Sequence, residues 1–411
     1  RTCLRYGNME TLENGYGVSL LPLASFAIET YADDPCELFT PKVPKDGPFS
    51  QQEIRLLAQM QKAMAIIQFK LESQLIKRRP HYERGARLLL DKVDFVAGTV
   101  SLGGVDYPLL DSHFPTIDPQ RPDALTAAEQ AVVDKLRHSF VHSRKLQQHT
   151  RFLFANGSIY LIHDGNLLYH GCIAMNEDGS FRSFNVDGRA YAGKAFLDRV
   201  DRLARQGYFS IDDPAQKQYG MDAMWFLWCA PESPLFGKEK MATFERYFLA
   251  DQATHKEKRN AYYALRDQVD TAEKILREFG LDSRTGHIIN GHVPVKVVKG
   301  ERPVKANGRL IVIDGGFSRA YQKETGIAGY TLISNSRGWL LAAHQPFESR
   351  QRAICDEVDM DSETEIIESH PVRMHIRHTD EGKAIQREID QLKALLEAYR
   401  EGSIKERRLS V

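Results

Sequence analysis

The sequence predicts a mixed fold of class α/β (α+β), in which helices flank sheets of short strands. Two long segments with an apolar residue at every third or fourth position follow helix-capping motifs, as in amphipathic helices. Elsewhere, short apolar runs are bounded by glycine, proline, Asn-Gly or Asp-Gly, as in strands joined by tight turns. The 411 residues allow two or three domains or one large one, and we find no internal repeat.

Capping boxes mark the beginnings of the two long helices. Ser50 followed by Glu53 opens a helical period that continues to about residue 77. Thr126 followed by Glu129 opens a second one that continues to about residue 140. Residues 41–150 are therefore expected to be largely helical, with short strand-like pieces in the stretch 98–122 between the two helices.

Residues 151–170 are expected to form a three-stranded antiparallel meander. An Asn-Gly pair separates the apolar runs 151–155 and 158–163, and an Asp-Gly pair separates the second run from 166–170. The remaining elements are expected as helices at 193–204 (ended by Gly207) and 270–279 (ended by Gly280), and as strands at 287–289, 309–313 and 330–333.

The C-terminal part is expected to be a charged surface connection over residues 348–380, followed by a helix. The helix carries apolar residues on one face: Ile385, Ile389, Leu392, Leu395 and Tyr399. Such a face suits packing on the chain itself or on a partner, so a homo-oligomer is a possible assembly.

Composition excludes several classes of protein. Lys and Arg total 55, as do Asp and Glu, so the chain lacks the basic excess of a general nucleic-acid binder, and we expect no nucleic-acid partner. The longest apolar stretch, 18–28, is interrupted by Pro22 and too short to span a membrane, so no membrane association is expected. Five scattered cysteines without a CxxC pair favour a reducing, cytoplasmic location.

Two histidines occur in similar surroundings. His170 follows the apolar run Asn166-Leu167-Leu168-Tyr169, and His292 follows a second apolar run and Gly291. Ligand sites of α/β sheets collect beyond strand ends, and a neutral imidazole is a good ligand for divalent metals. Each histidine taken singly is more often a packed residue at a strand end than a ligand, and two histidines do not complete a metal site.

Three charged residues are weaker candidates. Asp314 follows the most apolar strand and could orient a metal-bound histidine, or it could cap the turn at Gly315 and Gly316. Lys238 and Arg246 could present cations to a phosphate, or they could belong to a solvated helix face.

Other motifs are expected to be structural or incidental. The basic run 77–79 suits the end of a helix, where cations interact favourably with the helix dipole. Asp111 and His113 have the spacing of a metal pair, but no strong apolar strand precedes them. The sequence contains no P-loop, dinucleotide-binding, serine-hydrolase or zincin motif.

Several runs together resemble one family, the class III fructose-1,6-bisphosphatases of Firmicutes-type bacteria, in the calcineurin-like metallophosphoesterase superfamily. The matching runs lie at residues 65–73, 76–80, 165–172, 235–238, 243–248, 254–258, 286–292, 305–308 and 311–318, continuing to 326–331. The resemblance extends from the first residues to about 345 and is less distinctive after 348. It implies a metallophosphoesterase-type β-sandwich flanked by helices.

The resemblance also implies a site with two divalent ions, often Mn²⁺, for which His170 and His292 would be ligands. Asp314 remains a candidate for orienting a metal-bound histidine, and Lys238 and Arg246 remain candidates for substrate binding, on the grounds given above. The family usually has Thr after the second histidine, where this chain has Val293, so one hydroxyl contact is in doubt.

The early metal motifs of the family, Asp-x-His, Gly-Asp-x-x-Asp-Arg-Gly and Gly-Asn-His-Asp, do not occur in this sequence. The resemblance therefore implies a fragment, the C-terminal part of a longer enzyme, whose proton donor would lie in the part not included. On this interpretation residues 1–40 continue a truncated phosphoesterase half, 41–150 are a helical insertion, 151–345 are the C-terminal half of the domain, and 346–411 are a connection and helix.

The activity implied for the parent enzyme is hydrolysis of fructose 1,6-bisphosphate to fructose 6-phosphate and phosphate in gluconeogenesis. These 411 residues alone are expected to bind metal weakly and to turn over little substrate. The alternatives are a non-catalytic remnant that binds sugar phosphate and another binuclear metallophosphoesterase.

Overall fold

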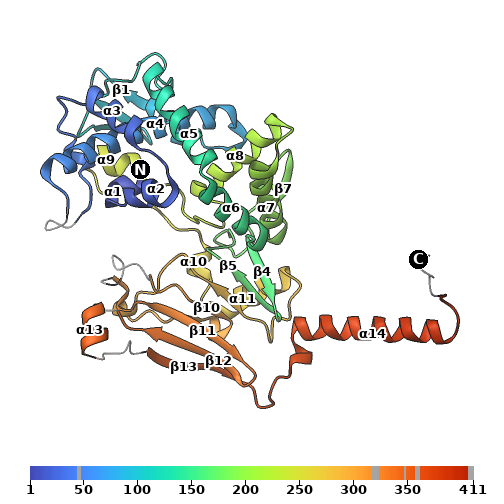
Figure 1. The fold of residues 1–411 in the computed structure, drawn as a ribbon. Helices are drawn as coiled ribbons and strands as arrows, with labels where there is room; N and C mark the ends of the chain where they lie inside the picture. The colour runs from blue at the N-terminus through green and yellow to red at the C-terminus, as the bar shows by residue number, and fades with distance from the viewer. Residues whose placement is uncertain (44–47, 317–321, 323, 347–348, 357–361, 406–411) are drawn as a thin grey trace.

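The computed structural model describes residues 1–43, 48–316, 322, 324–346, 349–356 and 362–405. Two hydrophobic cores organise these residues (Figure 1). We call the first the helical body, whose core runs from Leu4 to Val132 and includes Phe244 to Leu249. We call the second the sheet body, whose core contains Leu75, Tyr82 and buried residues from Leu167 to Leu341.

The helical body is built around α4, a helix of 28 residues that spans Gln51–Arg78. Its other elements are α1 (Thr2–Tyr6), α2 (Met9–Tyr16), α3 (Leu21–Thr30), the antiparallel strands β1 (Val93–Asp94), β2 (Thr99–Leu102) and β3 (Val105–Pro108), α5 (Ala127–His142) and α9 (Thr243–Phe248). Both predicted capping boxes are confirmed, with Ser50 at the beginning of α4 and Thr126 at the beginning of α5. Part of the sequence between α3 and α4, residues 44–47, lies outside the described residues.

The predicted meander at 151–170 is wrong in its first strand. Residues 151–155 belong to a helix, α6 (Arg144–Asn156), whose N-cap Ser143 accepts a hydrogen bond from the amide of Leu146. The hairpin is formed instead by β4 (Tyr160–His163) and β5 (Asn166–Tyr169). Its turn is Asp164-Gly165, with φ of 48° and 76°, the positive values that such hairpin turns require. The other Gly, Gly157, follows the end of α6, where its amide donates to the carbonyl oxygen of Leu153.

The central sheet has the strand order β4-β5-β8-β10-β9. The middle strands β5, β8 (Ile288–Asn290) and β10 (Leu310–Val312) are parallel, so their carboxyl ends lie at one edge. Strand β9 (Val304–Lys305) is antiparallel to β10. All three residues of β8 and of β10 are buried, as expected for parallel strands covered on both faces.

A second, antiparallel sheet contains β11 (Gly329–Asn335), β12 (Gly338–His344) and β13 (Ser362–Ser369). It contacts the central sheet through Trp339, whose ring lies 4.9 Å from that of His287. The prediction of a plain surface connection at 348–380 is wrong, because β13 and the short helix α13 (Arg350–Cys355) lie there. The first four residues of β13 are exposed and charged or polar, so this part of the strand shows no alternation of apolar and polar residues in the sequence.

Helices and a small hairpin cover the sheet body: β6 (Phe184–Val186), β7 (Arg189–Tyr191), α7 (Gly193–Phe209), α8 (Pro214–Cys229), α10 (Tyr262–Leu265) and α11 (Val269–Glu278). Gly207 was expected to end α7, but the helix continues through it. A Cβ at Gly207 would lie 2.6 Å from the carbonyl carbon of Gly220 on α8, so the glycine is there for close helix packing. The prediction that Gly280 follows the end of α11 is confirmed, with φ of 73°.

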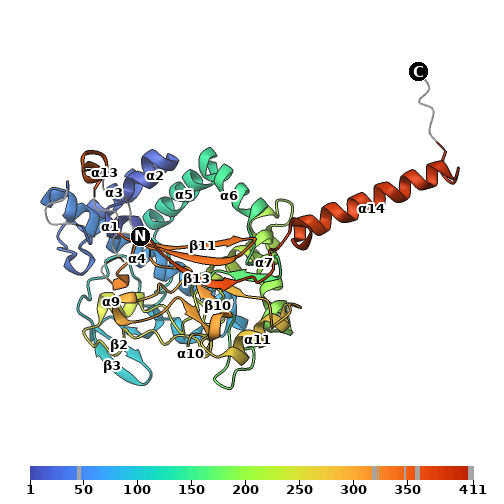
Figure 2. The same cartoon turned by 90° about the horizontal axis from the view of Figure 1, so that it is seen from below.

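The last helix, α14 (Asp380–Arg400), projects away from the rest of the molecule in both views (Figures 1 and 2). Its predicted apolar face is exposed in the single chain: Ile385, Ile389, Leu392, Leu395 and Tyr399. Leu396, which was not predicted as part of this face, is exposed as well. Among the described residues, no helix has the length and hydropathy needed to cross a membrane. The boundaries predicted at residues 40, 150 and 345 stay predictions.

Candidate active site at the carboxyl edge of the central sheet

The fold brings the two predicted histidines into contact, although 122 positions separate them in the sequence. His170 directly follows β5, and His292 lies two residues after β8. Because these strands are parallel neighbours, both side chains emerge at the same edge of the sheet. His170 Nε2 lies 3.0 Å from His292 Nδ1.

The backbone around the histidines is closely packed. The amide of Gly291 donates a hydrogen bond of 2.9 Å to the carbonyl oxygen of His170, which ties the two strand ends together. A side chain at Gly171 would collide with the carbonyl oxygen of Pro234. His292 itself has φ of 67°, a left-handed conformation that costs energy in a non-glycine residue and is characteristic of functional sites.

The surroundings favour neutral imidazoles. Burial lowers the pKa of His170, against an opposing effect of the Asp314 carboxylate. Burial and the neighbouring His170 lower the pKa of His292, and the Lys238 ammonium adds to this effect. Both rings are therefore uncharged at neutral pH, and each has a nitrogen lone pair available for a ligand.

A divalent metal ion fits this arrangement. The second ring nitrogen of His292, Nε2, lies 3.2 Å from the carbonyl oxygen of Phe236 and donates to it. This hydrogen bond leaves Nδ1 unprotonated and fixes the ring, as backbone carbonyls do for metal-binding histidines. A separation of 3.0 Å between His170 Nε2 and His292 Nδ1 matches two adjacent positions of an octahedral shell with metal–nitrogen bonds of about 2.1 Å.

The described residues hold only part of a metal site at this edge. Among them, no carboxylate or thiolate atom joins the histidine pair in a group of three ligand atoms within 4.8 Å. One such group occurs elsewhere in the described part of the chain, at His163, Asp164 and Asp380. There the two aspartates accept hydrogen bonds from each other's backbone amides, which join the turn between β4 and β5 to the first residue of α14.

Asp314 lies behind the histidines, two residues after β10. Its Oδ1 accepts a hydrogen bond of 2.9 Å from the amide of Gly316, so it does stabilise the turn. Its charge also reaches His170, where it opposes the lowering of the pKa by burial. The orienting role remains a prediction, and part of the run 311–318 lies outside the described residues.

Lys238 and Arg246 share one carboxylate. Lys238 Nζ lies 2.9 Å from Glu257 Oε2, and Arg246 Nη1 lies 3.1 Å from Glu257 Oε1. Only Lys238 borders a cavity, which has a volume of about 580 Å³. Lys238 is two residues after Phe236, the residue whose carbonyl binds His292, so the loop 233–238 connects the histidine pair to this cavity.

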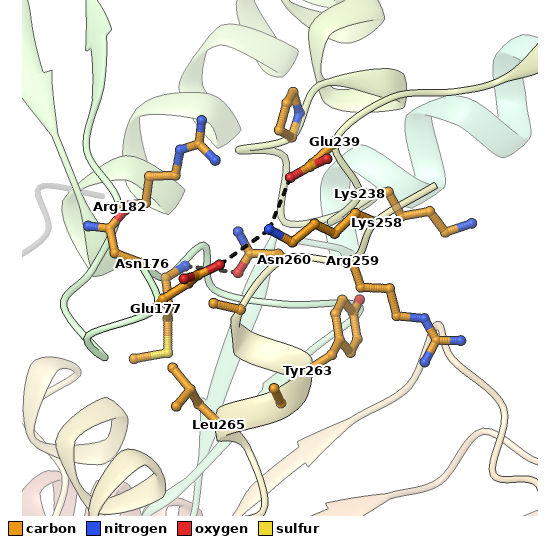
Figure 3. Close-up of a pocket in the computed structure, with 14 residues that line it drawn as sticks. Asn176, Glu177, Arg182, Lys238, Glu239, Lys258, Arg259, Asn260, Tyr263 and Leu265 are labelled. Atoms are coloured by element: carbon orange, nitrogen blue, oxygen red, sulfur yellow. Dashed lines mark hydrogen bonds and ion pairs between the residues drawn. The ribbon is translucent and has the colours of Figure 1, made fainter. Parts of the chain in front are cut away.

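The cavity is lined by side chains of both charges (Figure 3). Lys258 crosses its centre, with Nζ 3.2 Å from Glu177 and 3.6 Å from Glu239. Arg182 lines the opposite side from Lys238 and Arg259. The sequence analysis did not single out Arg259, because the loop that places it beside Lys238 has no local sequence signature.

The remaining motifs are structural, as expected. Arg78 binds both carboxylate oxygens of Asp222, at 2.9 and 2.6 Å, and Arg79 binds one of them at 2.8 Å. Asp111 and His113 bind protein groups instead of forming a pair: Asp111 accepts from Lys62, and His113 lies 2.8 Å from Asp34.

Comparison with known proteins settles the family. The chain matches the Firmicute fructose-1,6-bisphosphatase family over residues 1–401. It belongs to that family. Three relatives, each called "Fructose-1,6-bisphosphatase class 3", come from Alkaliphilus metalliredigens, Bacteroides fragilis and Clostridium tetani. Each is 52% identical to this chain over 410, 408 and 406 residues respectively.

The matches cover 99% of this chain, whereas the chain spans 62% of the Alkaliphilus relative and 61% of the other two. No solved structure matches the chain. The expectation that further metal motifs lie outside these 411 residues stays a prediction.

Proposed function

We propose that this protein takes part in the hydrolysis of fructose 1,6-bisphosphate to fructose 6-phosphate and phosphate, a hydrolase reaction of carbohydrate metabolism and gluconeogenesis. One structural observation carries the proposal: His170 and His292 meet at 3.0 Å beyond parallel strands, in a geometry that suits a divalent metal. Membership of a family named for this activity supports it.

The fold supports a metallophosphoesterase arrangement. The central sheet and the second sheet pack against each other, and Trp339 and Leu341 of the second sheet share one core with Ile288 and Leu310 of the central sheet. The histidines lie at the carboxyl edge of this pair of sheets, where ligand sites collect beyond parallel strands.

His170 and His292 would hold one of two divalent ions, with Mn²⁺ as the proposed metal. Such a pair of ions supplies an activated nucleophile and stabilises the attacking and leaving oxygens. The carbonyl of Phe236 keeps the ring of His292 in place, and Lys238 adds a positive charge beside it. These residues of the chain therefore position a phosphate group at the edge of the sheet.

The test is phosphate release from fructose 1,6-bisphosphate with added Mn²⁺, together with a direct titration of Mn²⁺. Both are measured for the 411-residue chain and for a version extended by the residues encoded upstream. We expect His170→Ala and His292→Ala to lower Mn²⁺ affinity and phosphate release by about 100-fold or more. Mutating a residue that only hydrogen-bonds to a metal ligand already lowers metal affinity or activity by about 10- to 100-fold.

The matched control is His138→Ala, which removes an exposed histidine of α5. It should leave both measurements unchanged. Phosphate release that survives loss of either histidine would contradict the proposed site. Absence of release from both versions, with tight binding of fructose 6-phosphate, would instead favour a non-catalytic protein that binds sugar phosphate.

A further inference from the structure

A pair of cations next to the histidine site is held in place by the backbone. Lys238 and Arg259 face each other in an antiparallel β-bridge, so their side chains leave the backbone side by side. Figure 3 shows both extending to the same side of the cavity. The bridge is fixed on both sides of Arg259, since Glu239 donates to the carbonyl of Lys258 and Asn260 donates to that of Gly237, each at 2.9 Å.

The position of Arg259 is fixed further by buried contacts of its neighbour. The Asn260 side-chain oxygen accepts hydrogen bonds from the amides of Met175 and Tyr262, at 3.0 and 2.9 Å. Asn260 is buried, whereas the Arg259 side chain is exposed. A rigid backbone that carries an exposed cation reduces the entropy lost when an anion binds.

The charges around this pair do not cancel. Lys238 and Arg246 share the single carboxylate of Glu257. In the part of the chain that the structure describes, no carboxylate pairs with Arg259, whose guanidinium lies 5.9 Å from the ring centre of Tyr263. Glu177 and Glu239 also line the cavity, but both bind Lys258. Glu257 therefore serves both Lys238 and Arg246, and Arg259 adds a positive charge to the side of the cavity that Lys238 lines.

The cavity also contains a hydroxyl group available for a ligand. The Tyr263 side chain lines the cavity, and its buried hydroxyl has the Cys172 thiol, a weak hydrogen-bonding group, as its neighbour. Burial raises the pKa of Tyr263, so the hydroxyl stays protonated and can donate. A hydroxyl with so weak a partner can donate to a ligand in the cavity.

We propose that Arg259 and Lys238 bind the phosphate group of the substrate that is not hydrolysed, and that they make the site selective for a sugar bisphosphate over a sugar monophosphate. This inference rests on the proposed function. Lys238 lies between the two parts of the site: its backbone pairs with Arg259, and Phe236, two residues before it, accepts the hydrogen bond from His292. A guanidinium binds a phosphate through two parallel hydrogen bonds, so Arg259 is the main selectivity residue.

The experiment measures dissociation constants by calorimetry for the 411-residue chain with Mn²⁺ present. The ligands are fructose 1,6-bisphosphate, fructose 6-phosphate and fructose 1-phosphate. We expect the bisphosphate to bind at least about 10-fold more tightly than fructose 1-phosphate. Arg259→Ala should weaken the bisphosphate and fructose 6-phosphate by about 10- to 100-fold, as for a lost charged hydrogen bond, and leave fructose 1-phosphate nearly unchanged.

Two further variants separate a specific contact from a general effect of charge. Lys256→Ala removes a cation from the same loop that does not line the cavity, and it should leave all three constants within about twofold. Arg259→Lys keeps the charge but cannot form the bidentate pair of hydrogen bonds. Its affinity for the bisphosphate should therefore lie between those of the wild type and Arg259→Ala. Equal weakening of fructose 1-phosphate and the bisphosphate by Arg259→Ala, or equal effects of Lys256→Ala and Arg259→Ala, would overturn the inference.

Phosphate release is measured separately, so that the two proposals can fail independently. If phosphate is released but Arg259→Ala leaves the preference for the bisphosphate intact, the selectivity role is wrong and the proposed activity stands. If Arg259→Ala abolishes that preference but neither version of the chain releases phosphate, the binding role stands and the proposed activity is wrong. If the wild type binds none of the three sugars, the selectivity role is wrong.

Discussion

The helical body and the sheet body differ in how their charged side chains are paired. In the helical body, Lys62 and Lys70 of α4 are fully buried, and each ammonium contacts carboxylates or a carbonyl oxygen. At the edge of the sheet body, His170 and Arg259 are exposed, and Arg259 has no carboxylate partner among the described residues.

This difference distinguishes charged groups that stabilise the fold from groups that are available to bind a ligand. A buried charge must be paired, because desolvating it alone costs more than a fold can tolerate. Exposed polar groups that converge without pairing add little to stability, so their convergence is better explained by a ligand. Mutations of paired charges should therefore lower stability, and mutations at the sheet edge should change binding.

The largest loss of stability is expected from Lys70→Met. Lys70 Nζ lies 2.7 Å from both Glu129 Oε2 and the carbonyl oxygen of Thr116. Its removal leaves the buried Glu129 carboxylate without a counter-ion, which costs about 3–5 kcal/mol. Urea unfolding measures the change. Lys77→Met is the control on the same helix, because its half-exposed ammonium should contribute less than about 1 kcal/mol. Equal losses of stability for the two variants would contradict the claim that the buried ion pair matters more than the half-exposed one.

A smaller loss is expected from Gly171→Ala in the sheet body. The new methyl group would collide with the Pro234 carbonyl oxygen, and such overpacking costs about 1–3 kcal/mol. It should also separate the histidines and lower Mn²⁺ affinity. Gly291→Ala tests the space on the other strand, where the nearest atom would be Asp314 Cβ at 3.5 Å, an ordinary contact. Thermal unfolding and Mn²⁺ titration of both variants should rank Gly171→Ala as the more harmful.

Acid should weaken the helical body through Asp34. Burial opposes ionisation of Asp34, but hydrogen bonds from Lys62 and His113 outweigh it, so the pKa of this carboxyl lies well below its ordinary value. A depressed pKa stabilises the folded state above the unfolded value of about 3.9, and this contribution is lost as the pH falls toward the folded pKa. The free energy of unfolding should therefore decrease below about pH 4. Asp34→Asn should flatten that part of the curve, and an unchanged slope would contradict this account.

The smallest effect is expected from His113→Ala. The His113 side chain is 57% exposed, and its contact with Asp34 is secondary to that of the buried Lys62. We expect a change in unfolding free energy below about 1 kcal/mol and no change in Mn²⁺ affinity. A clear loss of Mn²⁺ binding would show that Asp111 and His113 act as the metal pair that their spacing resembles.

Short-range signals predicted much of the helical body and the central strands. The capping boxes at Ser50 and Thr126 are interactions over three residues, so the sequence displays them directly. Buried strands such as β8 and β10 are apolar throughout, which also needs no knowledge of the fold. His170 and His292 were recognised as candidate metal ligands because they follow such strands.

Other features depended on partners that are distant in the sequence. Glu129 was predicted as a capping residue, but its ion pair with Lys70 spans 59 positions. The exposed strand β13 is defined by its pairing with β12, not by an apolar pattern. Gly207 lies inside α7 because α8 approaches there, whereas in the sequence a glycine in that position is typical of a helix end.

Local sequence patterns were enough to place the beginnings of the two long capped helices, the buried strands β8 and β10, and the two histidines that follow strand ends. The tertiary structure alone decided that those histidines meet and that Arg259 stands beside Lys238. The physical reason is that helix capping and apolar periodicity arise from interactions between residues close in the sequence, whereas a site requires several distant chain segments to converge. That convergence is fixed by the parallel pairing of β5 with β8 and by the bridge at Lys238, contacts that only the folded chain makes.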